Sequence, residues 1–182
     1  MSDILISNLA IEAKAITLAW PGAVIACKAT GADTLVEWSD TSPVPAKTAA
    51  EISAAYAAYV TADAKTKKIA AVQALLATKI AAGRLHNTKT YQIRPEDREN
   101  FLGVAVMLAR AKLNPHAGAW RDLANTEVPL NDIEMGALID SVYAYLRDLR
   151  RAATTHTVAI RALGTVALVN AYDITAGWPA NS

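Results

Sequence analysis

The sequence predicts a mainly α-helical protein with small β elements. Two observations carry this prediction. The chain has 182 residues, of which 53% are hydrophobic but only 6% aromatic, and much of the apolar content is alanine, which favours helix. Apolar residues also recur at three- and four-residue steps over long stretches, between proline and glycine breaks. We expect a small α/β module at residues 1–46, a long Ala-rich connecting helix at 47–83 and a helical domain with a short β-hairpin at 84–182.

The first module is predicted to hold one helix and two strands. Leu9, Ala13 and Ile16 lie at helical spacing, and Pro21-Gly22 ends that helix. The stretches AVIACKA and TLVEWS are typical of strands, with a hairpin turn at TGAD between them. The two prolines of SPVPAK then favour an extended linker.

The connecting helix has clear ends. Thr48 and Glu51 form a capping-box pattern, and Gly83 stands where a C-terminal cap belongs. A helix of this length reaches about 50 Å, so we expect it either to break at the polar segment Asp63–Lys68 or to pack against a second copy. Its apolar stripe predicts either a seam between copies or an ordinary amphipathic face that covers its own core. The stripe comprises Ile52, Tyr56, Tyr59, Ile69, Val72, Leu76 and Ile80.

The last domain is predicted to begin with a short strand, KTYQI, and a helix that starts at Pro95. A loop at NPHAGA and a hairpin at WRDLANTEVPL, turning at Ala124-Asn125, follow. Asn131 and Glu134 cap a second long helix, and Thr165 caps a final short one. The expected buried faces are Phe101, Val104, Ala105 and Leu108 in the first helix, and Met135, Leu138, Ile139, Val142, Leu146 and Leu149 in the second.

Catalytic, cofactor and metal chemistry finds no support in the motifs. The sequence contains no nucleophile elbow and no glycine-rich phosphate loop. The single cysteine, Cys27, is expected to be a small buried hydrophobe. The groups RPEDRE at 94–99 and RDLRR at 147–151 are interpreted as solvated helix ends, and the former includes the carboxylates Glu96, Asp97 and Glu99. The three histidines, which lack metal-ligand spacing, are His86, His116 and His156.

Charge and hydropathy exclude two classes of partner. The net charge is +1, which argues against a duplex nucleic-acid surface. The longest clean apolar run, LGVAVMLA, is too short to span a bilayer, and the start of the chain lacks signal-peptide character. We therefore expect a soluble protein, without nucleic-acid or membrane partners, in the cytoplasm or in a particle assembled there.

Three tryptophans at element edges are candidate anchors for packing or for an interface: Trp38, Trp120 and Trp178. Trp178 stands between Gly177 and Pro179, a pattern that predicts a tail docked through its indole. We expect docking on its own domain in preference to a neighbouring subunit. Ala180–Ser182, by contrast, show no feature that would anchor them.

Residues 86–180 resemble a domain of unassigned function found in tail and tail-fibre proteins of tailed bacteriophages and prophages. The matching segments are TYQIRPEDRENF, WRDLANTEVPL with NDIEMGALI, and NAYDITAGWP. The upstream LVEWSDTSPVPAKTAAEISAAYAAY is similar to the connection in many tail-fibre and fibre-assembly proteins. The resemblance implies no catalytic residues. It implies a small structural tail or tail-fibre attachment component of the virion that assembles with itself and with other tail proteins. A tail-fibre assembly chaperone, absent from the mature particle, is the alternative.

Overall fold

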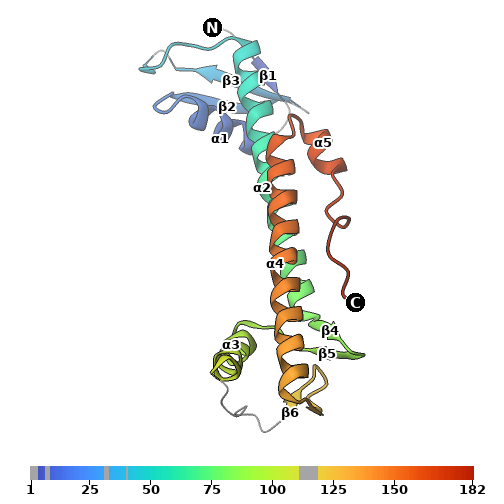
Figure 1. Ribbon diagram of the computed structural model, residues 1–182. Helices are drawn as coiled ribbons and strands as arrows, with labels where there is room; N and C mark the ends of the chain where they lie inside the picture. Colours follow the sequence, from blue (N-terminus) through green and yellow to red (C-terminus); the bar gives the residue numbers. More distant parts are fainter. Residues whose placement is uncertain (1–3, 7–8, 31–32, 40, 111–118) are drawn as a thin grey trace. The chain divides into compact units, whose positions relative to one another are not determined.

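The structure is a computed structural model that describes residues 4–6, 9–30, 33–39, 41–110 and 119–182. Side chains of residues 1–13, 26–35, 37, 38 and 40 are outside this description. The chain is mainly helical, as predicted, with a long helix in its middle and another near its end (Figure 1). Its contacts divide it into two compact units, each built from two stretches of sequence. The first is Met1–Lys68 with Leu163–Tyr172, and the second is Ile69–Ala162 with Asp173–Ser182.

The first unit contains a three-stranded antiparallel sheet, two whole helices and the first part of a third. The sheet has the order β1-β3-β2, from β1 (Ile4–Ile6), β2 (Ile25–Thr30) and β3 (Asp33–Trp38). The two predicted strands therefore pair with each other, while residues 31 and 32 of the predicted turn lie outside the described residues. β1 was not predicted, because three apolar residues are too few to show a period. The helices are α1 (Leu9–Ala19), the first part of α2 (Ala49–Ala81) and α5 (Val166–Ala171).

A small apolar cluster holds the described part of this unit together. Ile16 of α1, Val36 of β3 and Ile52 of α2 are each 1% exposed and form its centre. Trp20 and Ile25, which are partly buried, pack against them. The cluster joins helix to sheet, as expected for the apolar face of a short helix laid on strands.

Helix α2 is continuous through the polar segment where a break was one expectation. The predicted capping box is present: Glu51 N–H donates to Thr48 Oγ1 over 3.2 Å, and Thr48 N–H donates to Glu51 Oε2 over 2.8 Å. In the polar segment, Lys67 Nζ lies 2.7 Å from Asp63 Oδ2, one helical turn away. Pairs at this spacing stabilise a helix, and none of the residues there is a helix breaker, so α2 passes through unbroken.

The second unit carries two β-hairpins and two helices beside the end of α2. Hairpin β4 (Arg84–His86) with β5 (Lys89–Tyr91) follows Gly83. The sequence predicted β5 but not β4. The two turn residues, Asn87 and Thr88, both adopt positive φ without the glycine that usually marks such a turn. Gly83 itself has φ +79°, and a Cβ there would lie 2.5 Å from the Tyr91 carbonyl oxygen.

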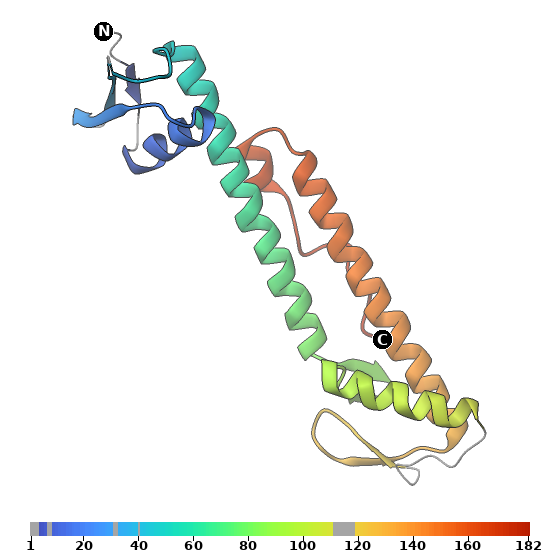
Figure 2. The ribbon, with the colours of Figure 1, turned by 90° about the vertical axis from the view of Figure 1, so that its left-hand side faces the viewer.

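The other elements of this unit match the prediction. They are α3 (Pro95–Ala109), the hairpin β6 (Ala119–Arg121) with β7 (Glu127–Pro129), and α4 (Asp132–Ala162). Asn125 has φ +63°, at the predicted turn. Most of the predicted loop NPHAGA lies outside the described residues. In Figure 2, α3 crosses the first part of α4.

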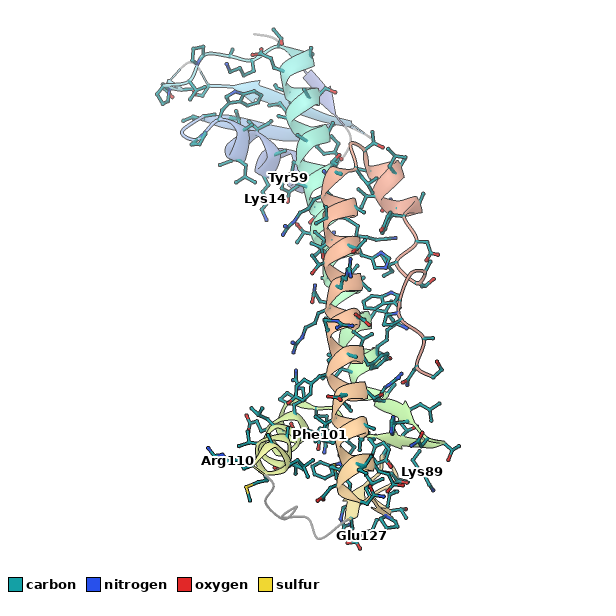
Figure 3. All side chains as sticks on the ribbon, viewed as in Figure 1. Lys14, Tyr59, Lys89, Phe101, Arg110 and Glu127 are labelled. Carbon is teal, nitrogen blue, oxygen red and sulfur yellow. The ribbon has the colours of Figure 1, made fainter. Side chains whose placement is uncertain are left out.

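Helices α3 and α4 build the larger core, and Phe101 lies on the side of α3 that faces α4 (Figure 3). All six residues of the predicted α4 face are buried, as are Phe101 and Val104 of α3. Ala105 and Leu108 are partly buried against the same cluster. A short bridge between Tyr91 and Asp122 ties the two hairpins together. None of the helices in the described part of the chain combines the length and apolar content of a membrane span.

Candidate interaction surfaces

The predicted stripe of α2 is used largely within the chain. Ile52 belongs to the first core, Val72 is fully buried, and Leu76 and Ile80 pack against the second core. Tyr56, Tyr59 and Ile69 are half-buried. For Ile52, Leu76 and Ile80, the amphipathic alternative therefore describes the helix, since each packs in a core of its own unit. The exposed side of α2 carries mostly alanine.

Trp178 docks within its own unit, as expected. The ring packs against the larger core, and its Nε1–H donates to the Ile174 carbonyl over 2.8 Å. The His156 ring lies 5.4 Å away and Lys79 Nζ lies 5.5 Å from the indole centroid, a cation–π distance. Gly177, at φ +74°, gives the turn that brings the indole back.

The end of the chain is anchored as well, which corrects the expectation for Ala180–Ser182. Asn181 Oδ1 accepts the Leu85 backbone N–H over 2.9 Å, and its Nδ2 donates to the Gly83 carbonyl over 3.2 Å. One amide side chain thus satisfies two backbone groups beside the β4–β5 hairpin. The sequence alone could not indicate this, because the two segments are almost a hundred residues apart.

The other two tryptophans differ in what the structure reveals. Trp120 of β6 stacks on Phe101, with ring centroids 4.5 Å apart and an interplanar angle of 18°. It therefore joins the β6–β7 hairpin to the larger core. Trp38 ends β3, opposite Ile25, and its side chain lies outside the description.

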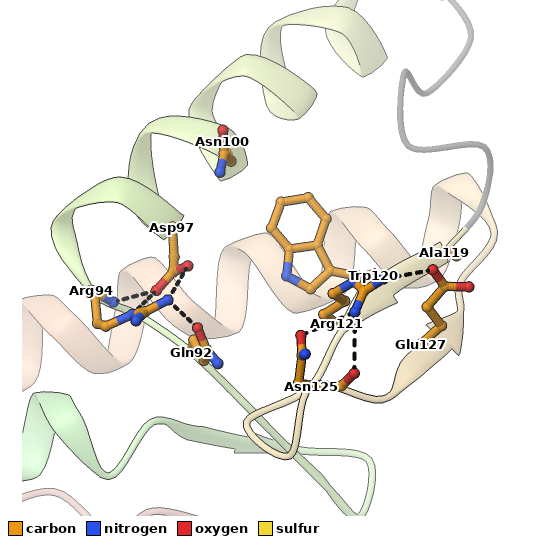
Figure 4. A pocket seen from close by; sticks show the side chains of 9 residues that line it. All are labelled: Gln92, Arg94, Asp97, Asn100, Ala119, Trp120, Arg121, Asn125 and Glu127. Carbon is orange, nitrogen blue, oxygen red and sulfur yellow. Dashed lines mark hydrogen bonds and ion pairs between the residues drawn. The ribbon is translucent and has the colours of Figure 1, made fainter.

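A polar pocket of about 420 Å³ lies between α3 and the β6–β7 hairpin. Figure 4 shows the Trp120 indole between two polar groups, Arg94 with Asp97 and Arg121 with Glu127. Arg94 Nε is 3.0 Å from Asp97 Oδ2, which raises the pKa of the Arg94 guanidinium, and Arg121 Nη2 is 3.2 Å from Glu127 Oε1. Each cation thus has its own carboxylate.

These polar groups have local structural tasks. Asp97 accepts the Arg94 backbone N–H over 2.9 Å and so caps α3, as the predicted solvated helix start requires. The Arg94 side chain also hydrogen-bonds Gln92. At the hairpin turn, the Arg121 guanidinium donates to Asn125 Oδ1 over 3.1 Å. The charged side chains of the pocket thus take part in the cap of α3 and in the β6–β7 hairpin.

A second hollow, the α3–α4 groove, is apolar at its base and basic at its edges. Its volume is about 600 Å³. Leu102 is 57% exposed and Tyr143 38% exposed, and the Tyr143 hydroxyl donates to the Arg98 carbonyl over 3.0 Å, which joins the two helices. The groove is lined by Pro95, Arg98, Glu99, Leu102, Tyr143, Leu146, Arg147 and Arg150.

The arginines of this groove are incompletely neutralised. Arg147 pairs with Asp148, Nε to Oδ1 at 3.0 Å, and the pairing lowers the pKa of that carboxyl. No described carboxylate lies within ion-pair distance of Arg98 or Arg150. The expectation of a helix end at 147–151 was wrong, because these residues lie in the middle of α4, where Leu149 is fully buried and Arg147 and Arg150 line the groove.

A third feature is the start of α4, where Ile133 is 84% exposed. The predicted cap is present: Glu134 N–H donates to Asn131 Oδ1 and Asn131 N–H donates to Glu134 Oε2, both over 2.9 Å. Asp132 and Glu134, both exposed, are the residues immediately before and after Ile133 in the sequence. An exposed isoleucine between two carboxylates is a compact acidic and apolar projection.

The described titratable groups converge on no metal-like cluster of three or more His, Cys, Asp and Glu side chains. His86 ends strand β4, whereas His156 lies in helix α4. His116 and the Cys27 side chain are outside the description. His86 Nε2 is buried without a hydrogen-bond partner among the described residues. Burial, and then the nearby Arg84, lower the pKa of His86.

Comparison with known proteins gives one match. No curated protein and no solved structure matches the chain. Residues 63–176 match a family described as a domain of unknown function, DUF4376, and this match spans more than half of the chain. The chain therefore belongs to the DUF4376 family.

Proposed function

We propose that the chain is a small structural component of a bacteriophage tail, a tail or tail-fibre attachment protein that acts by protein–protein assembly and not by catalysis. Its place would be the virion, after synthesis in the host cytoplasm. Its partners would be other copies of the chain and neighbouring tail proteins, with no role for nucleic acid or membrane lipids.

One observation carries the proposal. Most of the residues that resemble phage tail domains close the second unit: β5 with the cap of α3, the β6–β7 hairpin with the start of α4, and the docked Trp178 tail from Asp173 onward. Segments so far apart in sequence, yet joined in one packed unit, support a resemblance of whole domains. Isolated short matches would have no reason to meet.

The surfaces of the second unit also support an assembly role. The charged groups of the polar pocket are engaged in local pairs, whereas the α3–α4 groove and Ile133 leave apolar side chains exposed beside charge. Exposed apolar residues rimmed by polar ones are typical of protein–protein contacts.

Mass spectrometry of purified particles from a phage or induced prophage that encodes this chain tests the proposal. We expect peptides of the chain in a constant ratio to a known tail protein, through gradient purification and a salt wash. A host cytoplasmic protein of similar abundance is the control for carry-over.

The chaperone alternative has a different outcome. The chain would then co-purify with a fibre or tape-measure protein from lysates and be lost from finished particles. Absence from both particles and tail-protein complexes would contradict both functions.

A further inference from the structure

Two surfaces of the second unit are complementary in charge, and each exposes an apolar side chain. The α3–α4 groove presents exposed Leu102 above a partly apolar base, with three arginines and one glutamate among its lining residues. The projection at the start of α4, which we call the Ile133 knob, is defined as residues 132–134 and carries two carboxylates around one exposed isoleucine.

The two surfaces are not engaged with each other within one chain. Ile133 is 84% exposed and Leu102 57% exposed, so neither side chain is covered. Asp132 has no described cation within ion-pair distance, and Arg98 and Arg150 have no described anion. Each surface thus lacks what the other offers, a condition that favours contact between copies.

We propose that the Ile133 knob of one copy docks in the α3–α4 groove of a second copy. Ile133 would cover Leu102 and the apolar base, while Asp132 would approach Arg98 or Arg150. One such contact uses the knob of one copy and the groove of the other, so the pair keeps one free groove and one free knob, which can meet each other or bind further copies. Repetition of such a contact gives a ring where the rotation closes and a filament where it does not.

This inference rests on the proposed function, because that function includes assembly of the chain with copies of itself. A knob of three residues buries little area, so the contact belongs to the weak, concentration-dependent class. Opposed charges at its exposed edge also make it sensitive to salt, with weaker association at high ionic strength.

The test uses two double variants of the full chain. The groove variant is Leu102→Ser with Arg150→Glu, and the knob variant is Asp132→Asn with Ile133→Ser. All four side chains are exposed, and none supplies a described helix-cap hydrogen bond through its side chain. Circular dichroism melting verifies that both variants keep the fold. Val158→Ser is the matched control, since Val158 is 59% exposed on α4 and lies outside both surfaces.

Sedimentation velocity over a concentration series at low salt gives the readout. We expect the wild-type chain and Val158→Ser to rise above the 19.3 kDa monomer mass with concentration. Each double variant should remain near that mass, with a dissociation constant raised at least about tenfold, or 1.4 kcal/mol.

The decisive sample is an equimolar mixture of the two variants. The knob variant keeps an intact groove and the groove variant keeps an intact knob, so the mixture should form a one-to-one dimer and nothing larger. A mixture that stays monomeric, a wild-type chain that stays monomeric, or a double variant that associates like the wild type would overturn the contact. If the chain is monomeric yet present in purified virions, the contact is contradicted and the proposed function stands. If the chain self-associates but is absent from particles, the contact stands and the proposed virion role is contradicted.

Discussion

The first unit centres its described apolar packing on three buried residues, Ile16, Val36 and Ile52, whereas the second unit gathers twelve. Partly buried side chains also pack against the larger core: Trp120 from a hairpin, Trp178 from the tail and Leu76 from α2. Helix α2 supplies apolar side chains to both clusters. The size of each core therefore depends on how many elements pack around the helix, and not on the helix itself. Similar substitutions in the two units should for this reason have unequal effects on stability.

The largest effect is expected in the larger core. Leu138 is fully buried there, and Leu138→Ala should lower the free energy of unfolding by about 4 kcal/mol through lost burial and a residual cavity. The matched change in the first unit, Ile52→Ala, should cost about 2.5 kcal/mol, because a smaller cluster collapses more readily around the gap. Urea unfolding followed by circular dichroism measures both. Equal losses would contradict the contrast between the two cores.

The next effect concerns the tail. Trp178→Ala should destabilise the second unit by about 2 kcal/mol, less than the full-burial range because the indole is only partly buried. Since the ring docks within its own unit, the melting temperature should fall by the same amount at every protein concentration. Trp178→Phe, which keeps an aromatic ring but loses the hydrogen bond to Ile174, should cost less. A loss that fades as concentration rises would place the indole on a neighbouring copy.

A smaller effect is expected at the last anchored residue. Asn181→Ala removes two hydrogen bonds to backbone groups of Gly83 and Leu85, and we expect a loss of about 1 kcal/mol. Hydrogen exchange at the Leu85 amide should also accelerate. Deletion of Ser182 alone is the control and should change neither quantity. No change for Asn181→Ala would mean that water replaces the amide at no cost.

The smallest effect is a dependence on pH. Because the folded state lowers the pKa of His86, the unfolded chain binds a proton more readily as the pH falls below about 6.5. The contribution of His86 to stability is therefore complete above that pH and is lost as the pH falls towards the folded pKa. Chemical unfolding should show that the free energy of unfolding of the wild type falls between pH 7.5 and pH 5. The fall should be smaller in His86→Phe. An identical pH dependence in both proteins would assign the loss to other groups.

Local signals in the sequence predicted much of the fold. The ends of the long helices follow from short-range chemistry: Thr48 with Glu51, and Asn131 with Glu134, form the hydrogen bonds that their spacing indicates. The buried face of α4 follows from its helical period, because thirty-one residues repeat that period many times.

What the sequence could not supply is long-range or very short. Strands β1 and β4 have three residues each, as do β5, β6 and β7, and strands this short are found from sequence only where a turn or flanking residues mark them, as at Ala124-Asn125. The anchor at Asn181 and the α3–α4 groove depend on segments that meet only after folding, and periodicity carries no information about which helices cross. The apolar stripe of α2 was visible, but its division between two cores was not.

The interleaved units have a consequence for the order in which the chain is made. When residue 68 leaves the ribosome, the first unit still lacks Leu163–Tyr172, including the fully buried Val169 and the Asn170 carbonyl that accepts from Lys68 Nζ over 3.1 Å. The second unit in turn waits for its last ten residues, 173–182. Domains usually fold one after another from the N-terminus during synthesis. Here the first unit cannot be completed before residues 163–172 are made, nor the second before residues 173–182, so a nascent chain that stalls anywhere before residue 163 leaves both of them open.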